Sequence, residues 1–349
     1  MPSPTPLVDS DRLALRSAGA LAAMYAELAA LQARLAALPD WQPAASLAAE
    51  ADWVRQQLDQ MAATWSNKLV VALAGPSGAG KSTLLNALAG REVSPTGLER
   101  PTTRSLIAYV ADEADIAALR ARWGQADVQV QVAPAAPALQ YLVLVDAPDT
   151  NTTPAGLAAL GRVLDTADVV ITVFAAQNPR LHDNIQFLAP YVRRLPPESV
   201  VPVVNMVDRA PLAALQEQVL PDLRQALAAD WDLHPEHIYL VSAKASLPDA
   251  SFAPDEQPLN TVNEFDSLRQ FLFEALNRAS QVIDRRMARA QHLLALVNQD
   301  LAAAIAERRP AIESARDQLK HANQAMANAL QERLQRRASE LRGLDLHAA

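Results

Sequence analysis

The sequence of 349 residues contains no cysteine, and aromatic residues make up only 5% of it. Without cysteine the chain cannot form a disulfide, a thiolate zinc site, an iron–sulfur cluster or a thiol nucleophile. The histidines are not spaced as metal ligands. Uncharged apolar runs stay well below the roughly 20 residues that span a bilayer, and residues 1–9 lack the order of a signal peptide. We therefore expect a soluble, cytoplasmic, globular protein.

The net charge is -8, which argues against a general attraction of the chain to nucleic acid or anionic lipid. The charge is unevenly distributed, since residues 279–342 carry eleven Lys or Arg against seven Asp or Glu. This basic C-terminal segment is a candidate for peripheral contact with the inner membrane. RNA contact is the less favoured alternative, because the sequence contains no recognisable RNA-binding domain.

Helical patterns occupy both ends of the chain. Residues 9–38 and 44–67 are predicted helices separated by Pro39 and Pro43, and they form an N-terminal helical hairpin, 1–67. The C-terminal region, 259–349, is predicted to contain a helix at 262–278 and one or two long helices over 281–342, kinked near Pro310. Such a long amphipathic helix needs a partner for its apolar stripe: the N-terminal hairpin, another helix of its own, or a second molecule.

Between these regions the apolar pattern changes to short runs that alternate with helical stretches. The predicted strands are 69–74, 106–110, 141–145, 169–174, 200–204 and 238–241. Continuous apolar strands separated by helices indicate an α/β domain, 68–250, whose mostly parallel sheet is covered on both faces. Residues 127–132 are an additional candidate strand, expected to pair antiparallel with the strand that follows.

One glycine-rich segment carries the strongest chemical signal. It reads Gly75, Pro76, Ser77, Gly78, Ala79, Gly80, Lys81, Ser82 and Thr83, and it lies between a predicted strand and a predicted helix. This is the P-loop pattern G-x-x-x-x-G-K-[ST] in its proper context. Backbone N–H groups curl around the β-phosphate, Lys81 bridges the β- and γ-phosphates, and the Ser82 hydroxyl reaches Mg²⁺. The fold class is therefore a P-loop α/β sheet with an additional helical bundle or stalk from both termini.

A P-loop alone selects neither the base nor the reaction, so the downstream residues decide. Asp146 ends an apolar strand, as expected of a carboxylate that holds Mg²⁺ through water. A transporter ATPase is disfavoured, because no catalytic Glu follows Asp146 and no LSGGQ-like stretch occurs.

Two further segments resemble the guanine motifs of translation-factor-like GTPases. Asn205-Met206-Val207-Asp208 is similar to N-K-x-D, and Ser242-Ala243-Lys244 is similar to S-A-K. The resemblance implies GTP or GDP as the bound nucleotide and Mg²⁺ as cofactor. It also implies that Asn205 contacts the purine N7 edge, that Asp208 accepts hydrogen bonds from guanine N1 and N2, and that the Ala243 amide donates to O6.

The segment Pro101-Thr102-Thr103-Arg104 resembles the switch I region of the same GTPases. By this resemblance Thr102 or Thr103, with Thr103 favoured, joins Ser82 and Asp146 around Mg²⁺. The predicted catalytic residues are then Lys81, Thr103 and Asp146. A solvated or ion-paired Arg104 is preferred over an arginine finger.

Three residues depart from the family pattern. Asp149 replaces the glycine of D-x-x-G, so this switch either adopts another conformation or packs a carboxylate near the phosphates. Thr150 stands where small signalling GTPases have a water-orienting glutamine, and slow hydrolysis is expected. Met206 replaces the lysine of N-K-x-D and covers the base without hydrogen bonding.

Within this class, the chain is similar to the branch of septins, dynamin-like proteins and ribosome-assembly GTPases. Helices on both sides of the nucleotide-binding domain favour a dynamin-like GTPase whose helical arms mediate self-association, including a homodimer through either part, or membrane coupling. The alternatives are a ribosome- or RNA-associated GTPase and a catalytically weak GTP-dependent switch.

Overall fold

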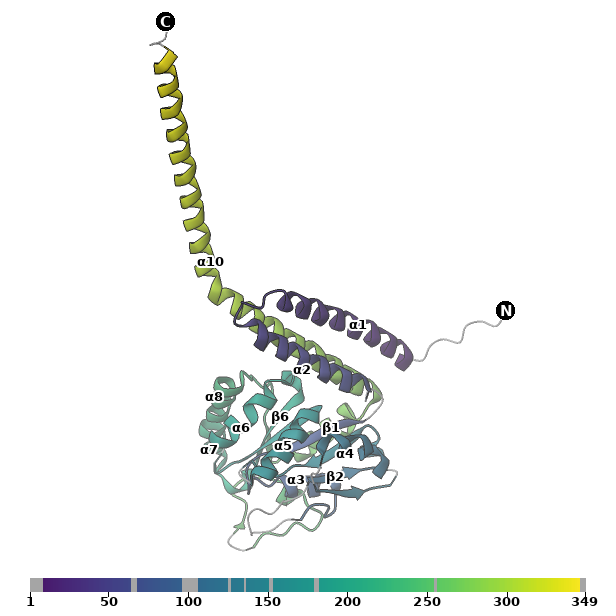
Figure 1. The fold of residues 1–349 in the computed structure, drawn as a ribbon. Helices are drawn as coiled ribbons and strands as arrows, with labels where there is room; N and C mark the ends of the chain where they lie inside the picture. Colours follow the sequence, from purple (N-terminus) through teal and green to yellow (C-terminus); the bar gives the residue numbers. More distant parts are fainter. Residues whose placement is uncertain are drawn as a thin grey trace, which may run out of the picture.

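The computed structural model describes residues 9–63, 68–95, 106–124, 127–134, 136–150, 153–178, 182–253 and 256–345. Within these residues, seven strands form one sheet in the order β3-β2-β4-β1-β5-β6-β7 (Figure 1). The strands are β1 (Leu69–Ala74), β2 (Leu106–Val110), β3 (Val128–Val132), β4 (Leu142–Asp146), β5 (Val169–Ala175), β6 (Val200–Asn205) and β7 (Tyr239–Val241). All neighbouring pairs are parallel except β2 with β4. The predicted mostly parallel α/β sheet is confirmed.

The additional strand β3 does not pair as the sequence led us to expect. It lies at the edge of the sheet, parallel to β2, and makes no strand pair with β4 among the described residues. The reason is the connection from β2 to β3, which contains the short helices Glu113–Ile116 and α4 (Ala117–Trp123). A helical crossover of this kind brings the second strand back in the same direction as the first.

Helices cover both faces of the sheet because its strands are apolar on both sides. On one face, alternate residues such as Val70 and Ala72 pack with Trp123 of α4 and Leu160 of α5. On the other face, Leu69 and its alternates pack with helices α3 and α9. The remaining bounds are α3 (Lys81–Ala89), α5 (Pro154–Thr166), α6 (His182–Val192), α7 (Leu212–Ala214), α8 (Leu220–Trp231) and α9 (Phe265–Gln270), with π-helical turns at Leu215–Val219 and Phe271–Leu276.

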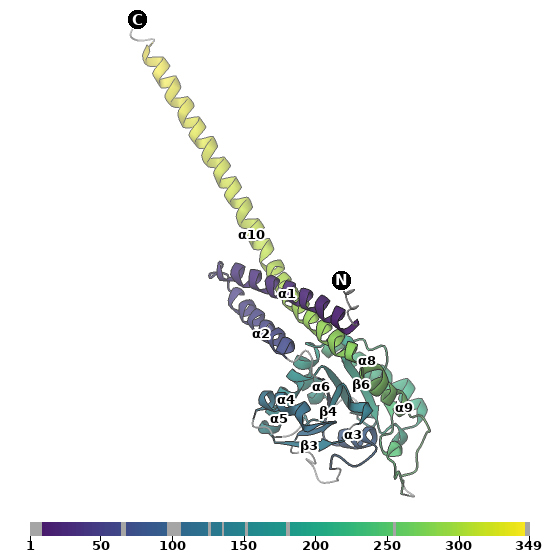
Figure 2. The same ribbon diagram turned by 90° about the vertical axis from the view of Figure 1, so that its right-hand side faces the viewer.

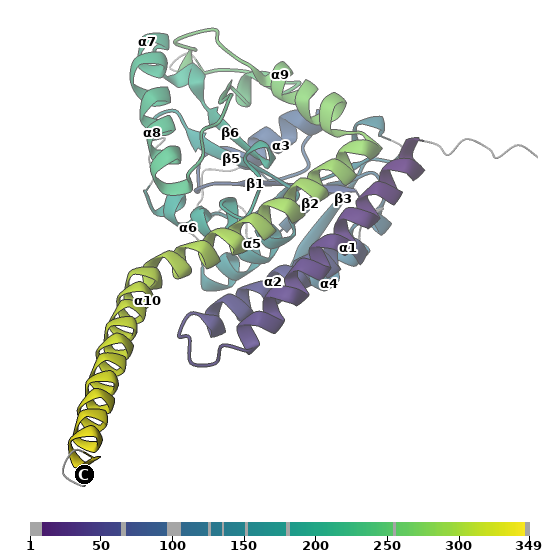
Figure 3. The ribbon, with the colours of Figure 1, turned by 90° about the horizontal axis from the view of Figure 1, so that it is seen from above.

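Three helices form an elongated extension, which we call the helical arm: α1 (Asp9–Ala36), α2 (Ala44–Ala63) and α10 (Ala279–Asp345). Viewed from above, they run side by side across one end of the sheet (Figure 3). Leu28, Val54, Leu58, Leu293 and Val297 are buried between them. The first part of α10 therefore uses the N-terminal hairpin as the partner for its apolar stripe.

The second part of α10 projects away from the rest of the molecule (Figures 1 and 2). It is one continuous helix that contains Pro310. Ile305, Ile312, Leu319 and Met326 are exposed along it, at 52 to 69% of their surface. Among the described residues, no helix is apolar enough over a sufficient length to cross a membrane.

The helical arm and the P-loop lie at opposite ends of the strands of the sheet. The P-loop follows the carboxyl end of β1, whereas Arg286 of α10 donates hydrogen bonds to the Lys68 carbonyl and to Asp168, at the amino ends of β1 and β5. Strand β1 has 6 residues, so it separates the two sites by roughly 20 Å.

Candidate nucleotide-binding site

The P-loop connects β1 to α3 and places its backbone beside β5 and β6. A side chain at Gly75 would collide with the Val173 carbonyl oxygen, and one at Gly80 would collide with Asn205 Nδ2. Gly80 also has a φ of 85°, which is a left-handed conformation that glycine adopts at little cost. The two glycines of the motif are therefore required by close approach and by backbone conformation.

Lys81 is the first residue of α3, and its side chain folds back over the P-loop. Its Nζ lies 3.0 Å from the Gly75 carbonyl oxygen and 3.3 Å from that of Pro76. It also forms an ion pair of 2.5 Å with Asp149 Oδ1, and both side chains are only 4% exposed. In this structure the Asp149 carboxylate is therefore paired with the ammonium group of Lys81, which in the P-loop motif binds phosphate.

The structure brings Ser82 and Asp146 together as the sequence predicts. Ser82 Oγ donates to Asp146 Oδ2 over 2.6 Å, and Ser94 Oγ donates to the same oxygen over 2.8 Å. Asp146 is fully buried, and its Oδ1 has no hydrogen-bond partner among the described residues. Burial raises the pKa of this carboxyl, while Lys81 and the two serine hydroxyls act in the opposite direction.

These groups fit a magnesium site. A hydroxyl and a buried carboxylate oxygen without a partner are ligands of the type that Mg²⁺ prefers. Ser94 was not predicted from the sequence. Its position depends on Asn86, whose Oδ1 accepts hydrogen bonds from the backbone amides of Val93 and Ser94. No recognisable motif marks this contact.

The segment after Asp146 packs against the P-loop. The Thr150 amide donates to the Gly75 carbonyl over 3.3 Å. Asp149 Oδ2 and Thr150 Oγ1 are buried, and neither has a hydrogen-bond partner in the part of the chain that the structure describes. Of the two arrangements considered for Asp149, the structure shows the one that packs its carboxylate at the phosphate lysine.

Asn205 connects the P-loop to the predicted base-binding loop. Its Nδ2 donates to the Ala79 carbonyl over 2.9 Å, and its Oδ1 accepts from the Ala243 amide over 3.0 Å. The side chain is 2% exposed. The amide groups of Asn205 and Ala243, both assigned to the base by resemblance, are here bonded to each other, so Asn205 fixes the relative position of the two loops.

The adjacent residues line the same side of the site. Met206 has a φ of 61°, unusual for a side chain of this size, and its Cε would lie 3.4 Å from a Cβ on Gly80. Asp208 is buried to 5% exposure. Asn260, not predicted, donates to the carbonyls of Val207 and Ala210 over 2.7 Å each and so holds the turn that carries Asp208.

Ser242, Ala243 and Lys244 follow β7 and are held by residues further along the chain. The Ser242 amide donates to Asn263 Oδ1 over 3.0 Å, and Lys244 Nζ pairs with Glu256 at 2.5 Å. Asn263 and Glu256 lie outside the recognised motifs. The predicted switch I residues Thr102, Thr103 and Arg104 lie outside the described residues, so their roles stay predictions.

The sheet and the strand–loop–helix position of the P-loop define a P-loop α/β fold with a helical extension. A family model described as "ABC transporter" matches residues 58–143, which is less than half of the chain. The match includes the P-loop and ends before Asp146, Asn205 and Ser242. A search of curated proteins gave no match.

Solved structures that match this chain include a bacterial dynamin, Era and an elongation factor. A bacterial dynamin, from a structure of an oligomerised dynamin pair, is 14% identical with a TM-score of 0.49, and the match covers 94% of this chain and 52% of that one. Era, in complex with MgGDPNP and part of 16S ribosomal RNA, is 20% identical with a TM-score of 0.39, over 59% and 56% of the two chains. A bacterial selenocysteine-specific elongation factor is 15% identical with a TM-score of 0.37, over 58% and 28%. The chain thus spans about half the length of the dynamin that it matches.

Proposed function

We propose that the chain binds GTP with Mg²⁺ and hydrolyses it to GDP and phosphate. The observation that carries this proposal is the Asn205 bridge, which joins a complete P-loop to the Ser242-Ala243-Lys244 loop in one continuous site. A P-loop alone would serve many nucleotides, whereas a second loop fixed beside it, next to the buried Asp208, is suited to recognise a base.

Each polar group then has a defined task. The P-loop amides and Lys81 bind the phosphates and stabilise the charge that develops on the transferred phosphoryl group. Ser82 and Asp146 would hold Mg²⁺, which would supply positive charge to offset that of the phosphates. Asp208 would select guanine by accepting two hydrogen bonds, and adenine would leave its carboxylate unsatisfied. The switch I threonines would complete the metal site.

The first test compares GTP with ATP, in binding and in turnover. We expect GTP to be preferred and Lys81→Ala to lower turnover by about 10²-fold or more, because a principal source of charge stabilisation is lost. Lys320→Ala, in an exposed position on α10, is the matched control and should leave turnover unchanged. Equal use of ATP would contradict the assignment of the guanine site.

We further propose that α10 mediates self-association, in keeping with a dynamin-like role. The exposed residues Ile305, Ile312, Leu319 and Met326 recur at every seventh position of the projecting part of α10. This is the spacing of one seam of a coiled coil. A second copy of the helix would cover the stripe that the N-terminal hairpin leaves exposed.

Sedimentation measures this association directly. The double variant Ile312→Lys/Leu319→Lys should weaken it by at least two orders of magnitude, since each buried side chain of this size contributes about 1.5–3 kcal/mol. Gln324→Lys/Gln331→Lys adds the same charge outside the stripe of every seventh residue and should associate like the wild type. A chain that stays monomeric at all concentrations, with GTP, with GDP and without nucleotide, would contradict self-association.

A further inference from the structure

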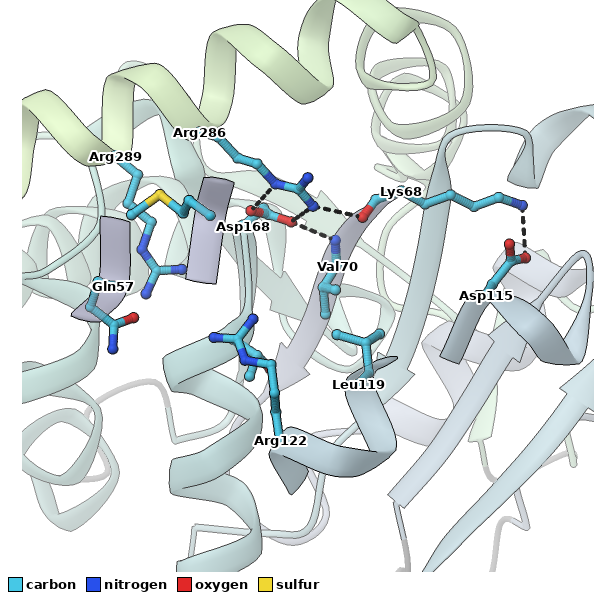
Figure 4. A pocket seen from close by; sticks show the side chains of 11 residues that line it. Gln57, Lys68, Val70, Asp115, Leu119, Arg122, Asp168, Arg286 and Arg289 are labelled. Carbon is cyan, nitrogen blue, oxygen red and sulfur yellow. Dashed lines mark hydrogen bonds and ion pairs between the residues drawn. The ribbon is translucent and has the colours of Figure 1, made fainter. Parts of the chain in front are cut away.

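A small cavity lies where the helical arm meets the sheet, away from the nucleotide site. Its volume is about 20 Å³, and it is lined by residues of α2, α4, α5 and α10 and by the amino ends of β1 and β5. Figure 4 shows the side chains around it. Four of these side chains, Lys68, Arg122, Arg286 and Arg289, carry a positive charge, whereas only Asp115 and Asp168 carry a negative one.

Both carboxylates are already engaged by other cations. Lys68 Nζ lies 2.8 Å from Asp115 Oδ2. Arg286 Nε lies 3.2 Å from Asp168 Oδ1, and Asp168 Oδ2 also accepts from the Val70 amide over 2.9 Å. Among the described residues, no carboxylate forms an ion pair with Arg122 or Arg289, and the charge of Asp168 acts on both arginines only from a longer distance.

Arg289 is the more deeply buried of these two arginines, at 5% exposure. It donates to two carbonyl oxygens at the end of α5, those of Ala167 over 2.5 Å and Asp165 over 2.9 Å. Its Nε has no hydrogen-bond partner among the described residues. Burial lowers the pKa of Arg289, the charge of Asp168 opposes this shift, and the charge of Arg122 adds to it.

Arg122 approaches from the other side. It donates to Gln60 Oε1 over 2.5 Å, and burial lowers its pKa as well. In Figure 4 the guanidinium groups of Arg122 and Arg289 point toward one another across the space beside Gln57. The nearby Asp165 carboxylate faces Arg194 at 3.9 Å and is 42% exposed, and its charge also acts on Arg122 and Arg289. Two like charges held close together in a poorly solvated place cost free energy unless an anion lies between them.

We propose that this cavity binds a small monovalent inorganic anion, with chloride as the physiological occupant. Free N–H groups of Arg122 and Arg289 would donate to the anion from opposite sides, in charge-assisted hydrogen bonds. One water needs about 10–15 Å³, so a space of about 20 Å³ is enough for a single small ligand such as a halide ion. A water molecule would fill the same space without neutralising either guanidinium.

From its position, an anion in this cavity would connect the helical arm to the nucleotide-binding domain. Arg289 belongs to α10, Arg122 to α4 beside the sheet, and Gln57 to α2. One ion between them would tie the helical arm to the nucleotide-binding domain without any direct contact between the charged groups. We therefore expect chloride to stabilise the folded chain beyond a general effect of salt.

Thermal unfolding in sodium chloride and in sodium gluconate of equal ionic strength tests this directly, since gluconate is too large for the cavity. The wild type should melt about 2–4 °C higher in chloride. Arg122→Gln removes one charge at a partly exposed position and should abolish the difference. Lys81→Ala should retain it, which excludes anion binding at the P-loop. Equal melting temperatures in both salts, or a chloride effect that persists in Arg122→Gln, would overturn the proposal.

Bromide provides an independent measurement that requires no variant. In crystals grown in sodium bromide, an anomalous peak is expected between the guanidinium groups of Arg122 and Arg289. Density for a water alone, without an anomalous peak, would overturn the proposal even if Arg122→Gln failed to fold.

Discussion

Asp149→Asn is expected to tighten the binding of both GTP and GDP by about 10- to 100-fold. In the free protein the Asp149 carboxylate neutralises Lys81 in a pair of 4% exposed side chains, and a phosphate has to displace it. Removal of one partner from a buried ion pair costs about 3–5 kcal/mol. The variant leaves Lys81 without its counter-charge in the free state, so part of this cost appears as a stronger attraction to phosphate. Titration with fluorescent GTP and GDP analogues measures the change.

Asp115→Asn is the matched control for this experiment. Asp115 also pairs with a lysine, Lys68, but at the opposite edge of the sheet. Loss of the Asp115 charge should leave the affinity for nucleotide unchanged. Unaltered or weaker binding by Asp149→Asn would show that the Asp149–Lys81 pair does not compete with phosphate. If the wild type itself bound no guanine nucleotide, the proposed function rather than the competition would fail.

Turnover of the Asp149→Gly variant separates two versions of the proposed function. If the aspartate suppresses hydrolysis, restoring the glycine of the D-x-x-G pattern should raise the rate strongly, and the natural protein is then a switch that holds GTP for a partner. An unchanged rate would favour a GTPase whose turnover depends on other groups, with Asp149 affecting affinity alone.

Asp208→Asn should reverse the choice of base. The proposed carboxylate accepts hydrogen bonds from guanine N1 and N2, and an asparagine replaces one acceptor with a donor. Sites built around such hydrogen bonds discriminate strongly, because a mismatched base leaves buried polar groups unpaired. We expect GTP to bind about 10²-fold more weakly and xanthosine triphosphate, which offers an acceptor in place of the N2 amine, to bind more tightly than it does to the wild type.

Competition binding with GTP, ATP and xanthosine triphosphate measures this reversal. Asp266→Asn, which changes an exposed carboxylate in the first turn of α9, should retain the preference of the wild type. If Asp208→Asn kept full affinity for GTP, the carboxylate would not contact the base, and the resemblance of residues 205–208 to N-K-x-D would be coincidental.

The sequence was sufficient to predict the sheet and the P-loop, because both depend on local patterns. Apolar runs such as residues 69–74 mark buried strands, and the spacing of Gly75, Gly80, Lys81 and Ser82 marks a phosphate loop. The pairing of β3 was predicted wrongly, because strand pairing depends on what lies between two strands. The short helices between β2 and β3 were the overlooked signal, because a helical crossover allows β3 to lie parallel to β2 instead of pairing with the strand that follows it.

The contacts of individual polar side chains could not be predicted from the sequence. Asp149 was visible as a departure from a motif, but its pairing with Lys81 depends on how two loops fold against each other. Asn205 was assigned to the base, whereas the structure shows its amide between two backbone segments. Arg286 and Arg289 looked like ordinary charged positions of a long helix, because their partners at the sheet edge are more than a hundred residues away in sequence.

The length of α10 has a mechanical consequence. The helix contains 67 residues, so at about 1.5 Å per residue it is roughly 100 Å long. Arg286 and Arg289 hold it to the sheet close to its first turns, α1 and α2 pack against the part that follows, and only the second part projects freely. Such an arrangement is a lever with its fulcrum beside the sheet, and a rotation of about 5° at the clamp would displace the far end by roughly 7 Å. Small rotations of α10 beside the sheet would therefore produce large displacements at its far end.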